Sequence, residues 1–170
     1  MPPNSNAPPC HSCPPCARLD PAKNRNEATL LSTCRLLRGD RLAAAEVANL
    51  LDRFDSVERV EDSTQLQGLF AWQARIDWAG EQLAEAGGAA AAWARKMSEG
   101  GRTHLYWDYI EGETAERVRF VGLLSRSLEN DAGYSQARVE QIWKRDGSSF
   151  QIERATVGAF ELEPSSGSEP

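Results

Sequence analysis

The amino-acid sequence predicts an α+β fold, in which N-terminal helices pack against a strongly curved, mainly antiparallel sheet. Two observations predict this fold. Up to about residue 97 the apolar residues recur at helical spacing, whereas from Gly101 onwards they alternate with a period of two. Glycine, asparagine and aspartate then divide the second half into segments of strand length. A sheet of this length must twist and can curl over the helices, which leaves a concave face suited to a small ligand.

The longest helix is expected from residue 40 to residue 54. Asp40 can cap its first turn, and its apolar residues lie on one stripe. The members of that stripe are Leu42, Val47, Leu50, Leu51 and Phe54. Shorter helices are expected at 27–37, from Ser63 or Thr64 to Phe70, and at 81–97, with a short strand at 75–78.

Four strands are expected after the helices. Their ranges are 103–110, 116–128, 134–145 and 149–162. The turns between them are marked by Glu111-Gly112, by residues 130–133 and by Asp146-Gly147. Consecutive hairpins of this kind form an antiparallel meander.

Composition divides the chain into three parts. Residues 1–39 form a Pro- and Cys-rich extension that we expect to be largely disordered, residues 40–162 form the folded domain, and residues 163–170 form a polar tail. The net charge of -6 argues against a nucleic-acid partner, because phosphate binding requires a basic field. No apolar run approaches the roughly 18–20 residues that cross a bilayer, and no signal-peptide pattern is present. We therefore expect a cytoplasmic protein without a membrane partner.

The N-terminal extension holds a cluster of cysteines, Cys10, Cys13 and Cys16, with Cys34 further along the chain. Two successive C-x-x-C steps can hold zinc or an iron–sulfur cluster. Prolines flank the cluster, however, and no apolar periodicity surrounds it, which favours incidental thiols in a disordered segment. We predict that this segment binds no metal.

His104 is the only histidine in the predicted domain and is therefore the candidate general acid–base. Because side chains alternate along a strand, Tyr106 and Asp108 are expected on the same face, with Asp108 able to orient the imidazole. The alternative is a solvent-exposed histidine at a strand end. Asp55 is a second candidate catalytic residue, because a carboxylate at a helix C-terminus opposes the helix dipole. Its alternative is a solvated turn residue.

Aromatic and polar side chains supply candidate substrate contacts. Phe54 and Trp78 can form a floor for a flat substrate, and the alternative is that they belong to the ordinary core. Gln136 and Arg138 share one face of a strand, where Arg138 can clamp an acidic or enolate oxygen. Alternatively, Arg138 and Glu140 simply pair on a solvated face.

Three segments carry a resemblance to a known family. They read Leu69-Phe70-Ala71…Ala74-Arg75-Ile76-Asp77-Trp78, Gly101-Arg102-Thr103-His104 and Trp143-Lys144-Arg145-Asp146-Gly147. Over about residues 42–160 the chain resembles the NTF2-like (SnoaL-like) superfamily, and within it the scytalone dehydratases most nearly. The resemblance implies a cone, with helices packed inside a strongly bent sheet and a pocket in its open mouth.

The resemblance also implies roles for individual residues. Scytalone dehydratases eliminate water from a phenolic substrate without metal or cofactor, and His104 matches their base. Asp55 matches the supporting carboxylate if residues 56–60 are an insertion, while Gln136 and Arg138 match residues that line the pocket.

The chain also departs from that pattern. Phe54 and Trp78 stand where the dehydratases have tyrosines, and no second histidine follows His104. Two functional interpretations therefore stay open. One is a cofactor-free lyase or isomerase that acts on a small cyclic, polyketide-type metabolite. The other is a non-catalytic module that binds a ligand or pairs with another subunit through the open sheet face, which leaves a homo-oligomer open.

Overall fold

The computed structural model describes residues 35–55, 66–83, 86–99, 103–127 and 133–163. Helices and strands are mixed in the first half, and strands alone follow. Their bounds are β1 (Leu37–Gly39), α3 (Arg41–Asp55), the 3-10 turn η2 (Gln67–Leu69), β2 (Phe70–Trp78), β3 (Glu81–Gln82), α4 (Ala89–Ser98), β4 (Thr103–Thr114), β5 (Arg117–Ser127), β6 (Tyr134–Asp146), β7 (Ser149–Val157) and β8 (Glu161–Glu163).

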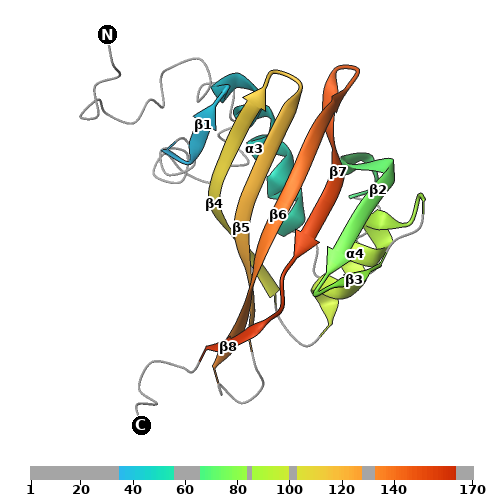
Figure 1. Cartoon of the computed structure of the whole chain (residues 1–170), viewed down its shortest axis with the longest axis vertical. Coiled ribbons are helices and arrows are strands. Elements are labelled where there is room, and N and C mark those ends of the chain that lie inside the picture. The colour runs from blue at the N-terminus through green and yellow to red at the C-terminus, as the bar shows by residue number, and fades with distance from the viewer. Residues whose placement is uncertain (1–34, 56–65, 84–85, 100–102, 128–132, 164–170) are drawn as a thin grey trace.

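The strands form one mixed sheet in the order β1-β4-β5-β6-β7-β2-β3, and β8 pairs with the start of β6. Strands β4 to β7 form the predicted antiparallel meander. Two parallel pairings flank it, because β1 lies beside β4 and β2 lies beside β7. Figure 1 shows α3 and α4 on the same side of this curved sheet. The predicted α+β fold with helices packed against a curved sheet is confirmed.

We call the sheet face that carries α3 and α4 the inner face, and the opposite face the outer face. Alternation along β5 separates them clearly, since Val118, Phe120 and Leu124 are buried in the core while Arg117 and Arg119 lie on the other side. Alanines and Val47 of α3 pack into this core. An ion pair fastens α3 to the end of β6, with Arg145 Nη1 3.2 Å from Glu46 Oε2.

Asp40 caps α3 as predicted, because its carboxylate accepts a hydrogen bond from the Ala43 amide at 3.1 Å. The predicted apolar stripe was partly wrong. Leu42 is 41% exposed, while the small residues Ala44 and Ala48 are fully buried. The close approach of α3 to the sheet explains this choice, since small side chains let a helix lie near the strands.

Several predicted boundaries were wrong, because pairing between strands decided the conformation. Leu37, the last residue of the helix predicted at 27–37, is the first residue of β1, which pairs with β4. Residues 81–82 pair with β2 instead of starting a helix, so α4 begins only at Ala89. Phe70 begins a nine-residue strand rather than ending a helix. Glu111-Gly112 lies inside β4, and the last predicted strand is divided into β7 and β8.

Some predictions concern residues outside the described ranges. They include the tail at residues 1–34 with its four cysteines, and the side chains of Phe54 and Asp55. The sheet begins at Leu37, slightly before the predicted domain boundary at residue 40. Within the described ranges, no helix is long and apolar enough to cross a bilayer.

Candidate binding face of the sheet

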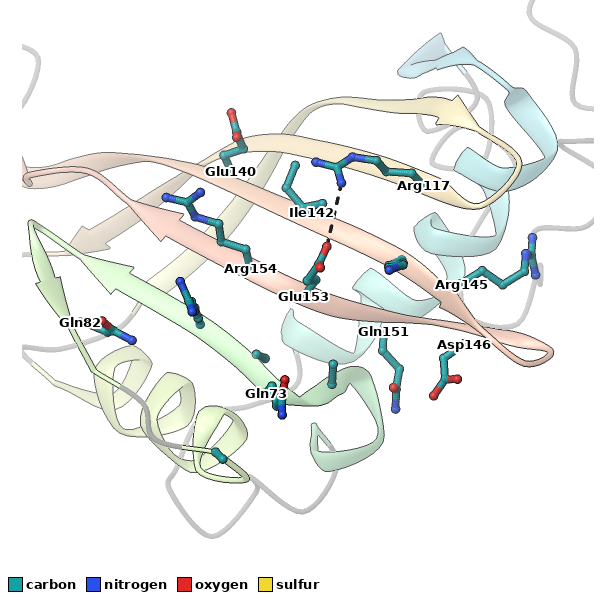
Figure 2. A pocket seen from close by; sticks show the side chains of 15 residues that line it. Gln73, Gln82, Arg117, Glu140, Ile142, Arg145, Asp146, Gln151, Glu153 and Arg154 are labelled. Atoms are coloured by element: carbon teal, nitrogen blue, oxygen red, sulfur yellow. Dashed lines mark ion pairs between the residues drawn. The ribbon is translucent and has the colours of Figure 1, made fainter.

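The candidate site lies on the outer face, where β5, β6, β7 and β2 run side by side. A β-bulge in β7 concentrates charge there. Ile142 of β6 is opposite Arg154, whereas the next residue, Trp143, is opposite Ile152, so Glu153 is an extra residue. A bulge interrupts the alternation of side chains. As a result, Glu153 and Arg154 are both exposed and both line the same trough (Figure 2).

An open trough of about 1170 Å³ crosses these strands. Its lining combines basic, acidic and amide side chains around one isoleucine, as the labelled residues in Figure 2 illustrate. The lining residues are Ala71, Gln73, Ala74, Arg75, Gln82, Ala86, Arg117, Glu140, Ile142, Lys144, Arg145, Asp146, Gln151, Glu153 and Arg154. Such a surface can bind polar or charged molecules through many side-chain donors.

Ion pairs neutralise two of the carboxylates that line the trough. Arg119 donates from Nη2 to Glu140 Oε2 at 2.7 Å and from Nε to the same oxygen at 3.1 Å. These hydrogen bonds raise the pKa of Arg119 above its ordinary value. Arg117 Nη1 lies 4.0 Å from Glu153 Oε2, the contact marked by the dashed line in Figure 2. Among the described residues, the lining side chains without an ion pair within 4.0 Å are Arg75, Lys144 and Asp146, so the unpaired charge of the lining is positive on balance.

Four of the predicted site residues also lie on the outer face, beyond the trough. Pairing of β4 with β5 and of β5 with β6 brings them into two adjacent cross-strand rows. The first row is His104, Ser125 and Gln136, and the second is Tyr106, Leu123 and Arg138. We call these six residues the His104 rows.

Within the His104 rows, the imidazole of His104 is exposed and its ring centroid lies 6.3 Å from that of Tyr106. Tyr106 is itself 57% exposed. In the described part of the chain, no carboxylate lies within ion-pair distance of His104. The β4–β5 register shifts between Trp107 and Tyr109, so Asp108 is an extra, exposed residue of β4, as Glu153 is in β7.

The predicted aromatic floor does not lie on this face. Trp78 is 6% exposed and packs in the core, with its ring centroid 5.7 Å from Trp93 and 6.0 Å from Phe160. Phe70 extends the cluster, at 6.3 Å from Trp93. Trp78 is thus separated from His104 by the thickness of the sheet.

The basic residues of the trough are not recognisable as a site from the sequence. Arg75, Arg117, Lys144 and Arg154 each resemble ordinary charge on a solvated strand. Only the pairing of the strands reveals that they gather in one place. The sequence signal that could have directed attention there is the succession of Lys144 and Arg145, followed by Arg154, in two adjacent predicted strands.

No group of histidine, cysteine, aspartate and glutamate among the described residues is arranged to hold a metal ion. On the inner face, the side chain of Gln141 is a buried polar group. Gln141 is completely buried, and its Oε1 accepts a hydrogen bond from Trp143 Nε1 at 3.0 Å. Its Nε2 has no partner among the residues that the structure describes.

Comparison with known proteins supports the fold. No known family's sequence profile matches the chain, and no curated protein matches it either. Solved structures do match. One is a hexachlorocyclohexane dehydrochlorinase (LinA) Type2, with 16% identity and a TM-score of 0.55, covering 77% of this chain and 96% of its own.

Two further structures have no known function. An NTF2-like protein from Shewanella oneidensis MR-1 has 12% identity and a TM-score of 0.54, covering 67% of this chain and 97% of its own. A domain with a cystatin-like fold from Nostoc punctiforme has 12% identity and a TM-score of 0.56, covering 70% of this chain and 79% of its own. The chain therefore has an NTF2-like fold. None of these three structures is a scytalone dehydratase, so that nearer resemblance stays a prediction.

Proposed function

We propose that this protein is a non-catalytic NTF2-like binding module that holds a small-molecule ligand on the outer face of its sheet. The observation that carries this proposal is the trough of about 1170 Å³ across β2, β7, β6 and β5. Its volume slightly exceeds the range of about 300–1,000 Å³ that is usual for small-molecule sites. Its walls offer side-chain amides and charged groups that can orient a ligand.

The position of His104 also favours binding over catalysis. A general acid–base works best where water is excluded and a partner orients the imidazole. His104 is exposed, and its described neighbours across the strands are Ser125 and, one strand further, Gln136. Hydroxyl and amide groups of this kind can hydrogen-bond a ligand without chemistry.

The test is to record amide chemical shifts of the full chain against a library of small metabolites, alongside sedimentation at several protein concentrations. We expect a ligand to shift amides of β6 and β7 around Lys144 and Gln151 much more than amides of α3. Shifts confined to the inner face and helices, or no shift with any compound, would overturn the proposal. Concentration-dependent association that protects the outer face would show a second copy there, and would overturn it too.

A second candidate function is a cofactor-free lyase or isomerase of the scytalone dehydratase kind, acting on a small cyclic metabolite. It is favoured by one observation, namely that His104, Tyr106, Gln136 and Arg138 share one face in two adjacent rows. In this hypothesis His104 removes a proton, Asp108 or Asp55 supports it, and Arg138 binds the developing oxyanion.

The catalytic hypothesis predicts a specific loss of activity. If a substrate is found, His104→Ala should lower turnover by about a hundredfold, the scale of general acid–base assistance. Stability should change little, because His104 is exposed at a strand end. Ser149→Ala, an exposed residue of β7 outside the His104 rows and the trough, is the control and should retain turnover. Normal turnover by His104→Ala would exclude the catalytic hypothesis.

A further inference from the structure

The trough contains two pairs of like charges that face each other across neighbouring strands. Arg75 of β2 is directly opposite Arg154 of β7. Arg117 of β5 is directly opposite Lys144 of β6. Like charges in directly opposed positions repel and destabilise a sheet. Two such pairs within one trough are therefore an energetic cost that folding alone does not explain.

Carboxylates of the protein compensate this charge only in part. Asp77 Oδ2 lies 3.5 Å from Arg154 Nη2. Arg117 has two carboxylates nearby, with Glu113 Oε1 3.7 Å from its Nε and Glu153 Oε2 4.0 Å from its Nη1. Arg75 and Lys144 have no ion pair within 4.0 Å among the described residues. Five basic and three acidic side chains line the trough, although the whole chain carries a net charge of -6.

The floor between the two pairs is Ile142, and the exposed carboxylate of Glu153 lies next to Arg154 in β7. Ile142, which is 8% exposed, is opposite Arg154 on the neighbouring strand, and Lys144 follows it two residues later on the same face. From strand spacings of about 4.8 Å and a rise of about 3.4 Å per residue, the centres of the two pairs are roughly 12 Å apart at the backbone. Gln151 is opposite Lys144 and adds an amide donor beside the second pair.

We propose that the trough binds a small organic dianion, with one anionic group on Arg75 and Arg154 and the other on Arg117 and Lys144. Carboxylate and phosphate both suit these partners, because guanidinium and ammonium groups form strong charge-assisted hydrogen bonds with either. The middle of the ligand lies over Ile142 and is apolar. This inference rests on the proposed binding function and names the chemical class of the ligand for the same face.

The test titrates the full chain with linear α,ω-dicarboxylates of increasing length, and with monocarboxylates of the same lengths, followed by calorimetry. Affinity should peak at one length, where the dicarboxylate binds at least tenfold more tightly than the monocarboxylate. Arg75→Gln and Lys144→Gln should each lower the affinity for the dicarboxylate to that for the monocarboxylate of the same length. Arg95→Gln, which removes an exposed cation of α4 outside the trough, is the matched control and should leave the affinity unchanged. The corresponding bisphosphates then distinguish a phosphate ligand from a carboxylate ligand.

A measurement without ligand tests the same repulsion. Arg75→Gln and Lys144→Gln should raise the melting temperature of the free protein, whereas Arg95→Gln should not. Equal affinity for dicarboxylates and monocarboxylates at every length, or melting temperatures that fall in both variants, would overturn the dianion inference. A neutral compound that shifts the amides of β6 and β7 would leave the proposed binding function standing while the dianion inference fails. If no compound of any charge perturbs the outer face, both fail.

Discussion

Gln141 of β6 shows how strongly the inner face constrains a single polar residue. Its side chain is completely buried, and its carbonyl oxygen accepts the hydrogen bond from the Trp143 indole. Replacing its amide by a carboxyl group keeps the shape and this acceptor but allows ionisation. Burial disfavours the charged form, so the folded-state pKa of the new carboxyl group should lie above its unfolded value near 4.3.

We therefore predict that Gln141→Glu destabilises the protein progressively as pH rises. At low pH the carboxyl group is neutral in both states and the variant should resemble the wild type. Above about pH 4.3 the unfolded chain releases the proton while the folded chain retains it, so the free energy of unfolding falls, by several kcal/mol at neutral pH. Gln136→Glu, on the outer face of the same strand, is the control and should stay nearly pH-independent relative to wild type. Urea denaturation between pH 4 and pH 8 measures both variants, and parallel pH profiles would contradict the prediction.

At the level of elements, the junction between α3 and β4 depends on a close approach of two backbones. Asp40, the N-cap of α3, donates its amide to the Gly112 carbonyl oxygen at 2.8 Å. A Cβ on Gly112 would overlap the backbone carbonyl of Asp40. Glycine within β4 therefore reflects the nearness of the helix and not a turn.

Gly112→Ala should displace the start of α3 from the sheet. We expect a loss of about 1–3 kcal/mol in the free energy of unfolding, the usual scale of overpacking. Gly68→Ala is the matched control, because a Cβ there meets no atom within 4 Å. Chemical denaturation of both variants measures the effect, and equal midpoints would show that the junction tolerates the extra methyl group.

For the whole molecule, the order of strands predicts which strands are best protected against local unfolding. Strands β5 and β6 pair on both sides along most of their length and cover the core. The two-residue β3 pairs only with β2, and the three-residue β8 pairs only with the start of β6. Amide exchange followed by mass spectrometry should therefore be slowest around Phe120 and Val139 and fast in β3 and β8. Slower exchange in β3 than in β5 would contradict this prediction.

The sequence by itself determined the fold class, the meander from residue 103 onwards and the cap at Asp40. These features follow from local properties, namely hydrophobic period, turn residues and side-chain hydrogen bonds within one turn. Gly101 marks the change of period, and the Asp146-Gly147 signal lies at the β6–β7 turn, where Gly147 has a φ of 64°.

Only the tertiary structure decided which side chains share a face and which strands lie together. β2 and β7 are far apart in the sequence, so the opposition of Arg75 and Arg154 depends on a long-range pairing. The extra residue in β7 turns both Glu153 and Arg154 outward, and Asp108 is likewise an extra residue in β4. When the pairing register of a strand shifts by one residue, its side chains exchange the two faces of the sheet. The register is set by packing across the sheet and not by the sequence of the strand alone. The candidate binding face is for this reason a property of the fold.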